Sequence, residues 1–226
     1  MSQVTRTSRR NFLQSAAAFA LAGRSFLRSG DARAALAEAR AHEAPTLPKM
    51  TYRKLGKTDF LGSRLIFGCG AALSGDPRDE LLDRAFDAGV NVFDVGTRRY
   101  YDNAEANLRP FLGKHREQVF LISKASVYLD IEPNAEVTLA QARQGARTWS
   151  MLLDESLGDL GVDHVDAYYL MGANNPSVIR NDEIYEAFLK AKKAGKTSHW
   201  GLSTHENAQN VLLAAAGTGR FALAQI

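Results

Sequence analysis

Six short apolar segments alternate with longer segments of helical periodicity from residue 51 onward, and this alternation constrains the fold most strongly. The apolar segments are rich in β-branched and aromatic residues, as buried strands are. Their starts lie 26, 29, 45, 33 and 24 residues apart, which is about the length of a strand–helix–strand unit. They cover residues 64–69, 90–95, 119–124, 164–171, 197–204 and 221–226. The pattern predicts a parallel sheet covered by helices.

The segments between these strands carry apolar stripes at helical spacing, which we expect to face the core. Pro77 is expected to begin the first helix and Gly89 to end it. The stripes are Leu81, Leu82, Ala85 and Phe86, then Leu152, Leu153, Ser156, Leu157 and Leu160, then Ile184, Tyr185, Phe188 and Leu189.

Two α/β architectures fit this alternation, a doubly wound sheet and a (β/α)8 barrel of the TIM type. A doubly wound dinucleotide fold has G-x-G-x-x-G directly after its first strand. Residues 68–73 read Gly-Cys-Gly-Ala-Ala-Leu, so the third glycine is missing and the barrel is favoured. Residues 51–63, with Gly56 at a turn, are expected to form an N-terminal hairpin that can close the bottom of the barrel.

About six of the eight strand–helix units of such a barrel are found before Ile226, so we expect an incomplete barrel. The two open sheet edges would favour self-association, because unpaired strands recruit other chains. Three readings follow: a fragment of a longer protein, a chain that a partner completes, or a decayed relative. We favour the fragment.

The N-terminus has the composition of an export signal. Residues 1–34 carry six arginines and one aspartate, a net charge of +5, which leaves −2 of the total +3 for the rest. Residues 8–13 read Ser-Arg-Arg-Asn-Phe-Leu, and an uncharged apolar stretch and an Ala-Arg-Ala triplet follow. This order is typical of a signal peptide, and the paired arginines resemble the twin-arginine type. An amphipathic helix or a disordered tail is the alternative reading.

We therefore predict a signal peptide at residues 1–34, a linker at 35–50 and the barrel domain at 51–226, with a periplasmic or exported location. The apolar stretch is too short to form a stable membrane span. The near-neutral body gives no reason to expect a nucleic-acid partner. Cys69 is the one cysteine, which excludes a disulfide framework. His199 and His205 lack carboxylates at ligand spacing, so no metal site is expected, and His205 is read as a loop residue.

Polar residues lie where two neighbouring predicted strands end. Asp94 ends one strand and Lys124 ends the next, and barrel chemistry is found at the carboxyl ends of strands. Tyr100 and Tyr101 follow Asp94 on the loop above. A lysine held cationic by an aspartate would lower the pKa of a nearby phenol, which would make a proton donor for a carbonyl group. A structural ion pair with two packing tyrosines is the alternative.

Five segments resemble the aldo-keto reductase family when taken in order. Residues 89–94 (GVNVFD), followed by a tyrosine and Ala104-Glu105, resemble its first signature, and residues 119–124 (VFLISK) its lysine strand. Residues 152–166 look like its second signature, and 195–203 (GKTSHWGLS) are similar to its fifth strand. Residues 52–58 (YRKLGKT) fit its usual opening.

The resemblance implies an NADPH-dependent reductase that uses aspartate, tyrosine, lysine and histidine. Asp94 and Lys124 match their family positions directly. Tyr101 matches best as the acid, because the family often has a glutamate about four residues later and Glu105 stands there, while Tyr100 remains open.

The family histidine is replaced. Its pattern Asp-x-Tyr-x-Leu-His occurs here as residues 166–171, DAYYLM, so Met171 stands in the histidine position. A thioether cannot donate a proton and accepts only weakly. The amide of Asn174 or Asn175 is the expected substitute, and loss of the carbonyl chemistry is the alternative.

The resemblance also implies a nicotinamide site. It places Ser203 and Gln225 beside the carboxamide, with Asp94 close by, and Thr204 where the family commonly has asparagine. The segment that holds the adenosine phosphates, and that decides between NADPH and NADH, would follow Ile226. Trp200 is expected near the pocket.

The sequence thus predicts reduction of an aldehyde, ketone or quinone, with hydride transfer from NADPH and a tyrosine acid. A non-catalytic or degenerate barrel that binds a nucleotide or a partner chain is the alternative, supported by Met171. A truncation product without a role of its own is the third reading.

Overall fold

The computed structural model describes residues 49–226, which form one compact unit. The predicted signal peptide at residues 1–34, and the predicted linker as far as residue 48, lie outside the described residues.

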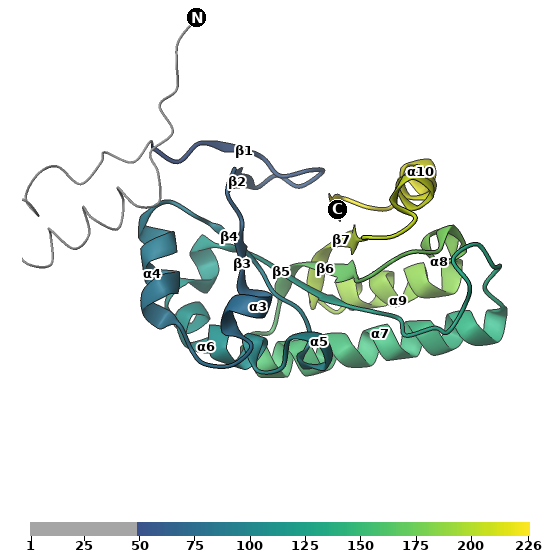
Figure 1. Cartoon of the computed structure of the whole chain (residues 1–226), viewed down its shortest axis with the longest axis horizontal. Coiled ribbons are helices and arrows are strands. Elements are labelled where there is room, and N and C mark those ends of the chain that lie inside the picture. The colour runs from purple at the N-terminus through teal and green to yellow at the C-terminus, as the bar shows by residue number, and fades with distance from the viewer. Residues whose placement is uncertain (1–48) are drawn as a thin grey trace, which may run out of the picture. The chain divides into compact units, whose positions relative to one another are not determined.

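Six parallel strands form a curled sheet whose spatial order is the order of the chain (Figure 1). They are β3 (Phe67–Gly68), β4 (Val92–Asp94), β5 (Phe120–Ala125), β6 (Val165–Leu170), β7 (Thr197–Ser203) and β8 (Leu223–Gln225). Each lies within a predicted strand or extends it by one residue. A doubly wound sheet reverses its strand order at a switch point. The described sheet has no such reversal, so it is a half-barrel consistent with an incomplete (β/α)8 barrel.

Helices connect the strands and cover the outer face of the sheet (Figure 1). They are α3 (Cys69–Leu73), α4 (Asp79–Asp87), α5 (Arg98–Tyr101), α6 (Ala104–His115), the 3₁₀ turn η1 (Arg116–Gln118), α7 (Leu139–Leu160), α8 (Pro176–Arg180), α9 (Asp182–Lys193) and α10 (Ala208–Thr218). Helical connections of this kind are what parallel neighbouring strands require.

The long helix α7 shows why these sequences fold locally as they do. Thr138 and Gln141 form a reciprocal capping box at its start, which satisfies two free N–H groups. Gly161 ends it with φ 65°, a conformation that favours glycine. Leu152, Leu153, Ser156 and Leu160 of its predicted stripe are buried.

Helix α4 departs from the prediction in two respects. It begins at Asp79, so Pro77 lies before the helix and not at its first position. Leu82 is buried, but Leu81 is 47% exposed and does not face the core. Adjacent helical residues are about 100° apart around the axis, so the narrow buried face that holds Leu82 excludes its neighbour. The helix ends before Gly89, which has φ 92°, as predicted.

Two apolar cores lie on the two faces of the sheet, because successive strand residues point in opposite directions. The larger core lies between the sheet and the helices and includes Phe93, Leu121 and Trp200. The smaller core fills the inside of the half-barrel; its buried members are Val92, Phe120, Ile122, Ala167, Tyr169 and Leu223. This alternation decides which polar side chains can reach the inside.

The expected N-terminal hairpin is present and contacts the inner core. Strands β1 (Tyr52–Lys54) and β2 (Leu61–Ser63) pair antiparallel, and Gly56 adopts φ 55° in the turn. Leu55 and Phe60 pack against the inner core, and the N–H of Lys57 donates to the carbonyl of Ala222 at 3.1 Å. Ala222 immediately precedes β8, so the hairpin lies at the amino-terminal end of the strands.

Within residues 49–226, no helix has the length and apolar character needed to cross a bilayer.

Candidate active site

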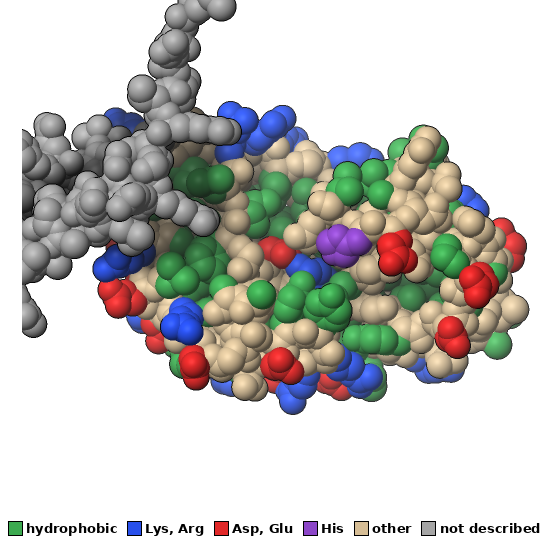
Figure 2. Space-filling view, in the orientation of Figure 1, with side chains coloured by type: hydrophobic (Ala, Val, Ile, Leu, Met, Phe, Trp, Pro, Cys, Tyr) green, Lys and Arg blue, Asp and Glu red, His purple; other side chains and the backbone are tan. Residues whose placement is uncertain are grey.

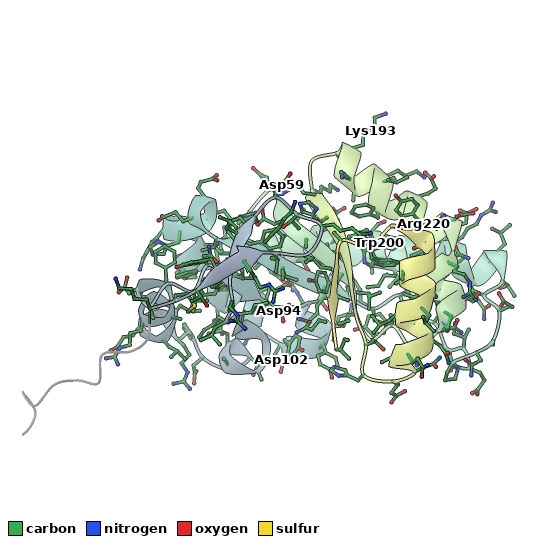
Figure 3. The ribbon with its side chains drawn as sticks, turned by 90° about the horizontal axis from the view of Figure 1, so that it is seen from above. Asp59, Asp94, Asp102, Lys193, Trp200 and Arg220 are labelled. Atoms are coloured by element: carbon green, nitrogen blue, oxygen red, sulfur yellow. The ribbon has the colours of Figure 1, made fainter. Side chains whose placement is uncertain are left out.

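Strand alternation brings the predicted polar residues to the inside of the half-barrel. Asp94 follows the inward-facing Val92 by two residues, and Lys124 follows the inward-facing Ile122 by two. Both lie at the carboxyl end of their strands. Asp94 is in register with Ile122, which precedes Lys124 by two residues and faces the same side of the sheet. The two side chains therefore converge at the mouth, as the sequence predicted. Figure 3 shows Asp94 near the middle of the curled ribbon.

Asp94 and Lys124 form a buried ion pair. The Nζ atom of Lys124 donates to both carboxylate oxygens of Asp94, at 2.6 and 2.5 Å. The lysine side chain is 5% exposed and that of the aspartate 10%. The amide of Gln225 adds a 3.3 Å hydrogen bond to Asp94. A buried charge requires such a partner, and each of these two residues provides it for the other.

Tyr101 packs on this pair, whereas Tyr100 does not. The Nζ atom of Lys124 lies 5.8 Å from the centre of the Tyr101 ring, while Tyr100 is 62% exposed. Two glycines make room for the ring. A Cβ atom on Gly70 would lie 2.6 Å from it, and one on Gly96 would lie 3.0 Å from both the ring and Lys124. The geometry thus favours Tyr101 over Tyr100 as the phenol of the site.

The pKa of Tyr101 is raised, which corrects the expectation that the lysine would lower it. Partial burial is the main cause, and the charge of Asp94 adds to it. The aspartate neutralises the ammonium, so the pair as a whole offers the phenolate no net positive charge. The phenol consequently keeps its proton at neutral pH.

The proposed nicotinamide contacts lie at the same rim. Ser203 ends β7, faces inward and is 5% exposed, and its hydroxyl accepts a long 3.4 Å bond from the N–H of Gly172. Gln225 lies in register with Ser203 on the next strand. Thr204 is buried, and its hydroxyl already donates to the carbonyl of Glu206 at 2.7 Å.

The expectation that Asn175 could replace the family histidine is wrong. Its side-chain oxygen accepts hydrogen bonds from the N–H groups of Ser177 and Val178, which begin α8. Its side-chain nitrogen donates to the carbonyls of Glu132 and Ala135. The oxygen is thus used as a helix cap and the nitrogen is used by the loop before α7, so no donor remains for a substrate. Asn174, half-buried, lines the pocket described next.

A cavity of about 410 Å³ opens between the loops that follow β5 and β6. Met171 lines it and is tied to β5 by the bond from its N–H to the carbonyl of Ala125 at 2.9 Å. Most of the remaining lining is apolar, and Asp130 supplies its single ionised side chain. The lining includes Val127, Tyr128, Leu129, Ile131, Leu170, Ala173 and Val178. Figure 2 shows apolar side chains grouped around the middle of the described face, beside acidic and basic side chains.

Trp200 is not near this mouth, contrary to expectation. It is 1% exposed, faces outward from β7, and stacks on Phe188 of α9 and on Phe221. Figure 3 shows it beside the helices. Its neighbours Gly201 and His199 face inward instead, with His199 stacked on Phe120 at 6.0 Å. His205 is an exposed loop residue, as predicted.

Two further residues adjoin the site from behind the sheet. Ser123 precedes Lys124 and points to the helices, where its hydroxyl donates to Glu105 at 2.6 Å. Glu105 is 1% exposed. The sequence pattern identified Glu105 only as a guide to the tyrosine, and its contact with the strand that carries the lysine depends on packing between distant segments.

The histidine, cysteine, aspartate and glutamate residues of the described chain form no group of three that could hold a metal ion.

Comparison with known proteins agrees with this architecture. The model of the aldo/keto reductase family matches residues 61–225. A Pseudomonas aeruginosa protein assigned to the aldo-keto reductases is similar in structure, with a TM-score of 0.55 and 22% identity over 76% of each chain. An aldo-keto reductase of Bacillus halodurans, solved in its holo form, has a TM-score of 0.54 and 24% identity over 69% of this chain and 50% of that one. This chain thus spans half the length of the Bacillus enzyme.

The match to the family model extends over most of the chain, and the half-barrel carries the aspartate, tyrosine and lysine at the mouth; the chain therefore belongs to the aldo/keto reductase family, whose members are oxidoreductases acting on carbonyl compounds.

Proposed function

We propose that the chain reduces an aldehyde, ketone or quinone with NADPH, using Tyr101 as the proton donor. The observation that carries this proposal is the buried, two-point Asp94–Lys124 ion pair against which the Tyr101 ring packs at the mouth of the half-barrel.

Each side chain has a role that follows from its surroundings. Asp94 pairs with the Lys124 ammonium in a site with little water. The ion pair lies against the Tyr101 ring, with the Lys124 Nζ atom 5.8 Å from the ring centre, and so holds the phenol at the mouth of the half-barrel. Tyr101 retains its proton at neutral pH because burial raises its pKa, so it is available to donate.

The proposed reduction needs only a hydride, the proton of Tyr101 and a proton from solvent. A hydride forms a C–H bond at the carbonyl carbon, and the electron pair of the C=O π bond moves to oxygen. The proton of Tyr101 then forms the O–H bond of the alcohol. Solvent then returns a proton to the phenolate.

The residues at the rim fit a nicotinamide. Its carboxamide offers one acceptor and two donors, and the Ser203 hydroxyl proton and the Gln225 side-chain oxygen are complementary to them. Neither of these groups is used by a hydrogen bond within residues 49–226. A dihydronicotinamide, when bound, supplies the hydride. The choice of NADPH over NADH rests on the family resemblance.

Met171 shapes the choice of substrate. It lines the apolar cavity in the place of an imidazole and cannot donate a hydrogen bond to the carbonyl oxygen. Tyr101 is then the main donor, so the site favours carbonyls that are already electrophilic, such as quinones and activated aldehydes.

Oxidation of NADPH at 340 nm with a panel of quinones, aldehydes and ketones tests the function. We expect Tyr101→Phe to lower kcat by about 10²–10⁴-fold, the usual range for an acid catalyst, whereas Tyr100→Phe stays close to wild type. If Tyr100→Phe loses turnover and Tyr101→Phe does not, the assignment is wrong. Cofactor binding is followed by NADPH emission or calorimetry, since Trp200 is remote from the mouth.

Met171 also supports a second candidate, a barrel that binds a nucleotide without reducing a carbonyl. This candidate predicts that NADPH binds, that no carbonyl in the panel is reduced, and that Met171→His does not create turnover. Turnover by the wild-type chain refutes it.

We further propose that the protein is exported by the twin-arginine route, on the strength of the arginine pair and apolar stretch in residues 1–34. A fusion of residues 1–50 to a folded reporter should reach the periplasm. Replacing both Arg9 and Arg10 with Lys should stop it, and unchanged export would reject the route.

Self-association through the sheet edges is a third proposal. Leu65 and Ile66 beside β3, and Ile226 beside β8, are 65%, 49% and 75% exposed. Sedimentation should show concentration-dependent oligomers that Ile66→Lys weakens. A monomer at every concentration would reject it.

A further inference from the structure

Glu105 is a buried carboxyl that the proposed reaction does not use. It lies in the first turn of α6, four residues after Tyr101, and is 1% exposed. Its Oε1 accepts a 2.6 Å hydrogen bond from the hydroxyl of Ser123. Its Oε2 has no hydrogen-bond partner among residues 49–226. Burying such an oxygen is costly, so its position calls for an explanation.

The bond from Ser123 leads directly to the lysine of the site. The Ser123 hydroxyl also accepts a hydrogen bond from the N–H of Lys124 at 2.7 Å. On the other side of the same residue, the carbonyl of Lys124 accepts a bond from the N–H of Thr97 at 3.2 Å. Thr97 and Glu105 flank Tyr101 in the chain. The segment that carries Tyr101 therefore binds the backbone of Lys124 at two points. Thr97 bonds directly to the Lys124 carbonyl, and Glu105 is linked to the Lys124 N–H through the Ser123 hydroxyl.

The turn between Tyr101 and Glu105 shows that this segment needs an anchor. Asp102 has φ 47°, in the left-handed region that costs energy for a residue with a side chain. Without a contact that holds the backbone after Asp102, the strained backbone would relax and the Tyr101 ring would move away from Lys124.

We propose that Glu105 is a positioning residue for the reductase reaction, which locks the Tyr101 segment onto β5 through Ser123 and so keeps the phenol against Lys124. The effect on turnover rests on the function proposed above. The coupling between Glu105 and Tyr101 can be measured without turnover.

The surroundings of Glu105 make this lock sensitive to pH. Burial raises the pKa of the carboxyl to about 7, and the hydrogen bond from the Ser123 hydroxyl on β5 opposes this rise. The nearby Ser156 hydroxyl on α7 also opposes it, although its own hydrogen bond is to the Tyr168 hydroxyl and not to Oε2. The charges that face it are Asp159 on α7, which raises the pKa, and Arg98 on α5, which lowers it. These two form an ion pair with each other, so their effects largely cancel. Tyr168 on β6 faces the carboxyl as an un-ionised phenol, because burial raises its own pKa.

The direction of the pH effect follows from the unpartnered oxygen. Below about pH 7 the carboxyl is neutral and Oε1 still accepts from Ser123. Above about pH 7 the bare Oε2 shares a full charge, which favours conformers in which the α5–α6 turn opens to water. The lock therefore weakens as the pH rises.

Carbon-13 NMR of the full chain, labelled at Cζ of tyrosine, tests the coupling. The Tyr101 signal is identified by its loss in Tyr101→Phe. We expect it to shift in one step with a midpoint of about pH 7, well below the titration of the phenol itself. The step should vanish in Glu105→Gln, which keeps the acceptor oxygen, and persist in the exposed control Glu186→Gln. A step that persists in Glu105→Gln, or is absent from wild type, overturns the proposal.

Turnover gives the second readout. A single group with a pKa of about 7 predicts that the ratio of Glu105→Gln to wild-type kcat rises about tenfold between about pH 6 and about pH 8. Ser123→Ala, which breaks the same chain of bonds, should lower kcat and leave the KM for NADPH unchanged. A fall in melting temperature with no change in the tyrosine signal or the pH profile would show a merely structural role. If the protein reduces no carbonyl, the proposed function fails while the NMR experiment still decides the coupling.

Discussion

The Asp94–Lys124 pair provides the sharpest test of the site, because its two charges are buried together. At 2.5 Å and an effective dielectric constant of about 20, their attraction is about 7 kcal/mol. Desolvation costs several kcal/mol for each ion, so the intact pair contributes little net stability. Either ion alone keeps its desolvation cost and loses the attraction.

Asp94→Val and Lys124→Met should therefore each lower the free energy of unfolding by about 3–5 kcal/mol. The double variant, which leaves two apolar side chains, should lose less than either single variant. Urea unfolding followed by circular dichroism at neutral pH measures the cycle. Glu80→Gln, which breaks the exposed pair with Arg84, is the control and should change stability by less than about 1 kcal/mol. If the double variant loses the sum of the two single losses, the reasoning is refuted.

Three further predictions concern the surroundings of this pair. Gly70→Ala places a Cβ atom 2.6 Å from the Tyr101 ring and should lower kcat at least tenfold. The control Gly75→Ala has open space around its Cβ atom and should leave kcat unchanged, so equal activities of the two variants would show that the ring moves freely. Met171→His introduces a hydrogen-bond donor and should raise kcat/KM for unactivated ketones by about tenfold, because one added hydrogen bond contributes about 1.4 kcal/mol. A lower kcat/KM in this variant would place residue 171 outside the substrate site. For Glu105, folding raises the pKa of the carboxyl from 4.5 to about 7, so the folded state retains a proton that the unfolded chain loses. The resulting contribution to stability is complete below about pH 4.5 and is lost as the pH rises through about 7, a change of about 3 kcal/mol. Urea titrations across this pH range should find the change in wild type and not in Glu105→Gln.

The sheet and the convergence of its polar residues could be predicted because each depends on local periodicity. Parallel strands joined by helices present their carboxyl ends at one rim, so Asp94 and Lys124 had to lie at the same mouth once their strands were recognised. The barrel was preferred to a doubly wound sheet because residues 68–73 lack the third glycine of the dinucleotide-binding motif. These inferences needed no knowledge of individual contacts.

Trp200 and Asn175 show where available signals were not used. Ser203 was expected inside, and strand residues alternate, so Trp200 at three residues away had to point outward. Asn175 precedes Pro176, and an asparagine before a proline at the first helical position is a capping signal. Reading that signal would have shown that the amide was already engaged.

The pKa of Tyr101 and the role of Glu105 could not be predicted in the same way. The first depends on whether the ammonium is neutralised by its partner, which is set by a distance and not by a sequence pattern. The second depends on the Ser123 hydroxyl bridging two elements that are distant in the chain. Tertiary geometry of this kind becomes visible once the strands and helices have been packed.

The hairpin contact with β8 has a consequence for the route of folding. Each strand of the sheet pairs with the next one to leave the ribosome, so the sheet can grow by neighbour-to-neighbour addition at low loop-closure cost. The bond between Lys57 and Ala222 joins the opposite ends of this progression and can form only after the last strand has docked. Hydrogen exchange of the Lys57 amide would thus report whether the sheet from β3 to β8 has assembled.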